Sequence, residues 1–147
     1  MKPDPDALAA RIDGYLMNLG VEVDPSDEGF WTLRFGSSMV VLSTFEDEGI
    51  EYVRLASVVL VGARASLALL TRLLRMNNEV LFGAFQLFDD DTVAFTHTLR
   101  ARELDAASFE AAVLYVARVG DDNDEELQAL AGGDRAEEVL EVAHRPS

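Results

Sequence analysis

The chain has no cysteine, only two histidines and few basic residues. Without cysteine there is no disulfide framework, no thiol nucleophile and no cysteine-bound zinc or iron–sulfur site. Twelve Lys and Arg residues stand against 27 Asp and Glu residues, which gives a net charge of −15. A chain this acidic repels nucleic-acid phosphates and anionic membrane surfaces. We therefore expect neither direct nucleic-acid binding nor membrane association.

Long hydrophobic runs are also missing. The longest apolar stretches, such as residues 56–63, are far shorter than the roughly 20 residues that a membrane-spanning helix needs. The N-terminal "MKPDPDALAARIDGYL" carries acids and prolines where a signal peptide would have a basic start and an apolar core. Since a chain without cysteine also suits a reducing compartment, we expect a cytoplasmic protein.

Motifs that carry chemistry are absent as well. The two histidines, His97 and His144, form no metal-binding pair, and no Gly-x-Ser-x-Gly elbow is present. The acidic "DDNDEE" that begins at Asp121 has Glu126 where an EF-hand calcium loop needs glycine. We predict no catalytic residue, no metal site and no cofactor. An enzyme that uses paired carboxylates stays as an alternative, because a sequence does not show which acids are buried.

The composition is that of a single globular unit. With 147 residues, 49% of them hydrophobic, the chain can bury a core without a disulfide or metal to stabilise it. We assign residues 1–133 to one domain and residues 134–147 to a helical or frayed C-terminal tail.

Hydrophobic spacing and capping residues predict three helices. Asp4 and Pro5 are typical of a helix start, and Gly20 is a plausible C-cap for that helix. Helical spacing returns from about residue 63 to 76, and two asparagines, Asn77 and Asn78, end it because asparagine tolerates a left-handed C-cap. Asp105 can cap a third helix.

Strand patterns fill the space between these helices. Alternating or continuously apolar segments predict strands over 30–35, 39–45, 50–61, 80–88 and 92–99. Gly83 inside the fourth of them indicates close approach to a packed neighbour, and Asp89, Asp90 and Asp91 form a hairpin turn. The order helix, three strands, helix, two strands, helix predicts an α+β fold with an antiparallel sheet of about five strands.

One family resembles this arrangement. The passage "LLTRLLRMNNEVLFGAFQLFDDDTVAFTHTL", followed by "DAASFEAAVLYVARVGDDNDEEL", resembles YbjN-type domains, which are similar in fold to type III secretion chaperones. The shared pieces are a Leu-rich helix that ends in Asn-Asn, a Phe-Gly-x-Phe strand, an acidic hairpin and a long helix with an acidic stretch. The resemblance implies a homodimer that binds a segment of a client protein along apolar patches.

The resemblance also indicates which residues would make these contacts. The client-facing candidates are Trp31, Leu33, Phe35, Val41 and Tyr52. The dimer candidates are Val58, Leu60, Leu67, Leu70 and Leu74. We predict a non-enzymatic protein-binding module of chaperone or adaptor type. The alternatives are a thick core that buries these side chains, and a regulator that binds a small ligand between the sheet and the second helix.

Overall fold

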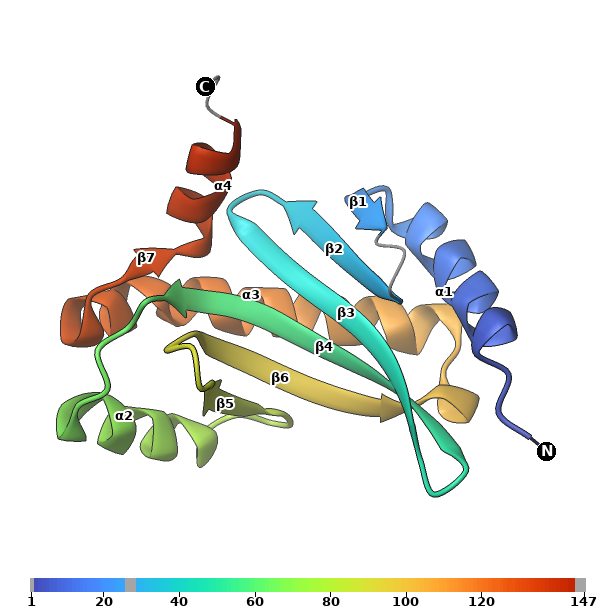
Figure 1. The fold of residues 1–147 in the computed structure, drawn as a ribbon, viewed down its shortest axis with the longest axis horizontal. Helices are drawn as coiled ribbons and strands as arrows, with labels where there is room; N and C mark the ends of the chain where they lie inside the picture. Colours follow the sequence, from blue (N-terminus) through green and yellow to red (C-terminus); the bar gives the residue numbers. More distant parts are fainter. Residues whose placement is uncertain (1, 26–28, 145–147) are drawn as a thin grey trace.

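The computed structural model describes residues 2–25 and 29–144 (Figure 1). Its helices are α1 (Pro5–Leu19), α2 (Leu67–Asn77), α3 (Ala106–Ala131) and α4 (Ala136–His144), with a short 3-10 helix η1 (Ala101–Glu103). Its strands are β1 (Glu22–Pro25), β2 (Phe30–Phe35), β3 (Ser38–Asp47), β4 (Ile50–Val61), β5 (Ala84–Leu87), β6 (Val93–Arg100) and β7 (Asp134–Arg135). The α+β class and the predicted order of the main elements are confirmed.

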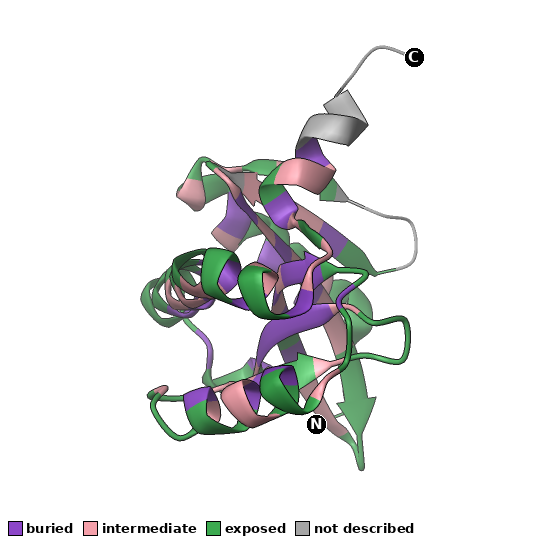
Figure 2. Cartoon of the chain, turned by 90° about the vertical axis from the view of Figure 1, so that its left-hand side faces the viewer, coloured by how far each residue is buried: buried purple, intermediate pink, exposed green. Residues whose placement is uncertain are grey.

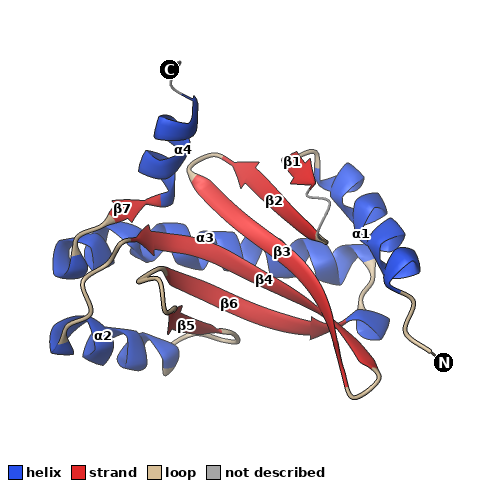
Figure 3. Cartoon of the chain, in the orientation of Figure 1, coloured by secondary structure: helices blue, strands red, loops and turns tan. Residues whose placement is uncertain are grey.

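All strand pairs in the described residues are antiparallel, in the order β1-β2-β3-β4-β6-β5, and β7 pairs with the end of β4. The sheet has seven strands, so the prediction of about five was wrong. The two extra strands are short (Figure 3). β1 lies in "VEVDPSDEG", which the sequence indicates is a short strand-like piece followed by a turn, although the five predicted strands do not include it. β7 has only two residues, too few for a hydrophobic period.

The core lies between the sheet and the helices behind it. In Figure 1, α3 runs across the back of the sheet, where it contacts β3, β4 and β6, and α1 lies beside β1. The largest fully buried side chains come from α1, α3 and the central strands, among them Ile12, Phe95 and Phe109. Figure 2 shows buried residues between these layers and exposed residues on the outer helix faces.

The helix boundaries follow their capping residues. The Asp4 carboxylate accepts hydrogen bonds from the first free amides of α1, and Gly20 ends that helix with a left-handed φ of 65°. At the start of α3, Asp105 and Ser108 form a reciprocal capping box. The predicted caps at these three positions are therefore confirmed.

The C-terminal segment packs on the sheet. β7 pairs with Leu60 and Val61 of β4, and α4 contacts β3 and β4. Arg135 joins the segment to both neighbouring helices, because its guanidinium lies 3.5 Å from Glu125 and 3.1 Å from Glu138. The division of the chain at residue 133 stays a prediction.

Candidate functional site

The two edges of the sheet differ, and β5 forms the edge that is closed. The side chain of Asn77, the last residue of α2, lies alongside β5. Its Nδ2 donates to the Phe85 carbonyl at 3.3 Å, and its Oδ1 accepts from the Phe85 amide at 2.6 Å. The carboxamide thus pairs with β5 as a neighbouring peptide group would. Asn78 is the C-cap as predicted, but its φ of −80° is right-handed, so the expected left-handed cap was wrong.

The segment before β5 is fixed by close packing. The backbone at Gly83 has a φ of 81°, and a Cβ there would lie 2.6 Å from the Thr96 carbonyl oxygen. This confirms the predicted close approach, and it explains why β5 starts at Ala84 rather than at residue 80. The ring of Phe82 packs against His97 and Tyr115 at centroid distances of 4.5 and 4.3 Å. These packing contacts identify the segment as scaffold.

β1 forms the opposite edge, and it is open. On one side β1 pairs with β2 along its whole length. On its other side, within residues 2–25 and 29–144, no backbone hydrogen bond joins it to another segment. Because successive residues of a strand direct their peptide groups to alternate sides, part of the β1 backbone remains available for pairing.

An apolar pocket lies directly beside this open edge. It has a volume of about 400 Å³ and is lined by Asp13, Leu16, Met17, Gly20, Val21 and Val23. Met17 stands at its rim with 83% of its side chain exposed. The Trp31 indole Nε1 donates to the Asp13 carboxylate at 2.9 Å and so fixes one wall. We call the free side of β1 together with this pocket the β1-edge groove.

The structure places the predicted client-facing residues in two environments. Trp31 and Leu33 are only 5% and 0% exposed, so they belong to the core beneath β1 and α1. Val41 and Tyr52 are half-buried on the central strands, and Tyr52 stacks on Phe45 at 5.2 Å. The side chain of Phe35 lies outside the described part of the chain. Client binding by these residues stays a prediction, and the burial of Trp31 and Leu33 leaves them no surface for direct contact.

The predicted dimer residues divide in the same way. Leu67 and Leu74 are 83% and 72% exposed on α2, and Leu70 lies between them on the same face. We call these three leucines the α2 stripe; the opposite face of α2 packs into the core. Leu60 is fully buried where β4 meets β7, and Val58 is half-buried. Dimer contacts by these residues are untested, and only the α2 stripe presents large exposed side chains.

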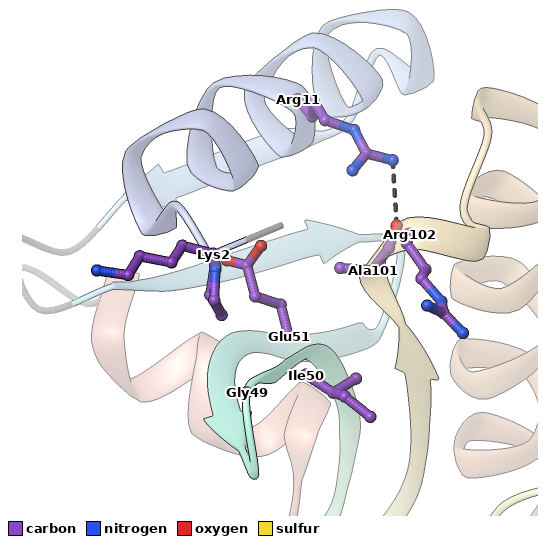
Figure 4. A pocket seen from close by; sticks show the side chains of 8 residues that line it. Lys2, Arg11, Gly49, Ile50, Glu51, Ala101 and Arg102 are labelled. Atoms are coloured by element: carbon purple, nitrogen blue, oxygen red, sulfur yellow. Dashed lines mark hydrogen bonds between the residues drawn. The ribbon is translucent and has the colours of Figure 1, made fainter.

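A second cleft, of about 360 Å³, lies between the start of α1, the β3–β4 hairpin and η1. Figure 4 shows Lys2 and Arg102 pointing to opposite sides of this cleft. Arg11 is already engaged, because its Nη2 donates to the Ala101 and Leu104 carbonyls at 3.1 Å each. No set of convergent polar groups therefore marks this cleft as a small-ligand site.

The carboxyl group of Asp124 is buried within α3. Burial, followed by the charge of Asp121, raises the pKa of Asp124, but Asp124 lines neither the groove nor the second cleft. Among the described residues, no group of three or more acids and histidines could hold a metal ion. No described helix has the length and apolar character to cross a membrane.

The groove was not predicted from the sequence, although one signal was present. Met17 lies off the apolar stripe of its own helix, so an apolar side chain falls on a face that would otherwise be polar. The position of Met17 is explained only by the three-dimensional structure, in which β1 lies beside α1.

Comparisons with known proteins agree with this architecture. The chain is similar in fold to a chain in the solved structure of the HopA1-SchA chaperone-effector complex, with a TM-score of 0.62 and 12% sequence identity. The match covers 84% of this chain and 99% of that chain. No curated protein matches the sequence. Residues 6–139 match the family model described as "T3SS (YopN, CesT) and YbjN peptide-binding chaperone 1". The resemblance found in the sequence is thus confirmed, and the chain belongs to this family of peptide-binding chaperones.

Proposed function

We propose that the protein is a homodimeric, non-enzymatic chaperone or adaptor that binds an extended segment of a partner protein in the β1-edge groove. The observation that carries this proposal is an apolar pocket beside β1, a strand that pairs with β2 on one side and with no described segment on the other. The reducing cytoplasm, which suits a chain without cysteine, is the compartment in which we place this activity.

Binding by strand addition combines two contributions. Main-chain hydrogen bonds to β1 would hold the segment in register, and each adds about 1 kcal/mol net. Alternate side chains of the segment face the pocket, and burying one Leu or Ile there contributes about 2 kcal/mol. The ordering of a flexible segment opposes both contributions, so we expect reversible binding that protects the segment until it is released.

The α2 stripe is the surface that we assign to the second copy of the chain. Leu67, Leu70 and Leu74 recur at three- and four-residue spacing, so they form one continuous apolar row. α2 and β1 lie at opposite ends of the molecule in Figure 1. A dimer formed through α2 therefore leaves both β1-edge grooves free for client segments.

Two single substitutions distinguish the β1-edge groove from the α2 stripe. Met17 and Leu67 are both 83% exposed, so aspartate at either position should leave folding intact. We expect Met17→Asp to weaken binding of a threonine-rich peptide with one central leucine by about tenfold or more, because it removes apolar contact and places a charge at the pocket. Leu67→Asp should leave this binding unchanged. The emission of Trp31, the sole tryptophan, reports binding through the hydrogen bond between its indole and Asp13 in the pocket wall.

Molar mass in solution tests the dimer. The wild-type chain should have twice its 16.1 kDa monomer mass. Leu67→Asp combined with Leu74→Asp should reduce it to a monomer, whereas Met17→Asp should remain a dimer. A monomeric wild type would refute the dimer alone, and equal loss of peptide binding in both variants would refute the groove.

A further inference from the structure

The β1-edge groove also carries a charge that can select its client. Building on the proposed function, we propose that the groove prefers segments in which Lys or Arg stands two residues from the aliphatic residue, and that Asp13 binds this cation while Trp31 holds Asp13 in position. The preferred partner is therefore an extended segment with alternating aliphatic and basic residues. Three observations support this.

The first is the geometry of Asp13. This residue lines the pocket from α1, and its side chain is exposed. Its Oδ1 accepts the hydrogen bond from the Trp31 indole at 2.9 Å, and no described group binds its Oδ2. Trp31 is 5% exposed and therefore fixed by the core. One carboxylate oxygen of this exposed residue is thus anchored, while the other has no partner among the described residues.

The second observation is the charge around the groove. Among the β1 residues whose exposure is described, Glu22 and Asp24 are exposed and acidic. They alternate with the pocket-lining Val23, so they lie on the opposite face and add to the negative charge of this edge at longer range than Asp13 does. The nearby cation Arg34 lies 3.1 Å from Asp24, so it neutralises that acid rather than Asp13. A basic segment is attracted to this rim and an acidic one is repelled.

The third observation is the strand period. Residues two apart on an added strand point to the same face, about 6.6 Å apart. When one aliphatic residue occupies the pocket, the residues two positions before and after it lie at the pocket rim. Asp13 shares the pocket with the aliphatic contacts Leu16 and Met17, so a long basic side chain at the rim can reach its carboxylate.

The test uses the threonine-rich peptide with one central leucine in three versions. Each version carries one residue type, Lys, Met or Glu, at the position two before and the position two after the leucine. The direction in which the peptide runs along β1 therefore does not matter. Affinities are measured by calorimetry at low and moderate salt. We expect the Lys version to bind about three- to fivefold more tightly than the Met version, as for a partly exposed ion pair. The Glu version should bind more weakly than both, and the Lys preference should shrink with salt.

Three variants assign this preference to its residues. Asp13→Asn should remove the Lys preference, so that the Lys and Met versions bind this variant equally well. Asparagine can still accept the indole hydrogen bond. Trp31→Phe, which keeps an aromatic ring but loses the donor, should reduce the preference. Asp89→Asn, at the β5–β6 hairpin on the far edge, removes the same charge and should leave the preference intact.

The outcomes distinguish this inference from the proposed function. If no version binds the wild-type protein, the groove itself is wrong and this inference fails with it. If the Lys and Met versions bind equally well, the groove stands and only the charge selection fails. A preference that survives Asp13→Asn, or that falls equally in Asp89→Asn, would show that the overall charge of the protein is responsible and would overturn the role of Asp13.

Discussion

The two edge strands of the sheet, β5 and β1, have different surroundings. At β5 a helix-terminal asparagine pairs with the edge backbone at Phe85, and a glycine lets the preceding segment pack tightly against β6. At β1 no such partner is found within residues 2–25 and 29–144, and an apolar pocket lies beside the strand. Unpaired edges invite association, and proteins usually cover them. This difference between the edges is the basis on which we propose that a client strand is added at β1 and not at β5.

Among the substitutions that test this comparison, the largest loss of stability should come from a substitution of Gly83, at the closed β5 edge. Gly83→Ala places a methyl group against the Thr96 carbonyl and the Phe95 ring at a φ of 81°. We expect a loss of about 3 kcal/mol in the free energy of unfolding, from left-handed strain together with overpacking. Urea denaturation measures it.

Gly36 provides the matched control for Gly83. It has a φ of 60°, but nothing lies within 4 Å of an added Cβ. Gly36→Ala should therefore cost only about 1 kcal/mol, from backbone strain alone. Equal losses at the two positions would show that the closed edge is not tightly packed.

A smaller effect is expected from Asn77. Asn77→Ala removes both hydrogen bonds to Phe85 and leaves its backbone groups unpaired, at a cost of about 2 kcal/mol in the free energy of unfolding. Amide exchange at Phe85 should accelerate. Asn78→Ala serves as the control, because no described hydrogen bond involves its side chain, and it should change stability by less than about 0.5 kcal/mol. An unchanged exchange rate at Phe85 in Asn77→Ala would refute the edge-closing role.

The smallest effect should come from His97, whose ring packs on Phe82 beside the closed edge. Burial lowers the pKa of His97 below its ordinary value of 6.5, so the folded protein holds this proton more weakly than the unfolded chain does. Stability should therefore fall as the pH drops through about 6.5 toward the lower folded pKa. Comparing wild type with His97→Gln in urea between pH 7.5 and 5.5 checks this. A pH dependence that is the same in both proteins would contradict it.

Local signals in the sequence predicted the main elements well. Asp4 and Gly20 mark the two ends of the first helix, and Asp105 caps the third. These positions could be predicted because capping depends on residues only a few positions away. The two edges could not be predicted in this way. Asn77 was expected to cap a helix, but its side chain also pairs with a strand eight residues further along. β7 pairs with β4 through only two residues, which carry no period of their own.

The binding surface was harder to predict because burial is decided by tertiary packing. Aromatic and aliphatic residues on a strand suit either a core or a client surface. In the structure Trp31 and Leu33 belong to the core cluster, together with buried residues of α1 and α3. The exposed α2 stripe was easier to predict. When a helix has two apolar faces, only one of them can enter the core, and the other stays at the surface. The pocket beside β1 brings together α1 and the strand that follows its C-cap, a juxtaposition that no local pattern specifies.

The central claim is that a client segment is added at β1 and not at β5. Hydrogen exchange of the backbone amides, measured with and without the bound leucine peptide, tests it most directly. We predict slower exchange within residues 22–24 and no change within residues 84–87. Protection within 84–87, or protection confined to the α2 stripe, would contradict the account.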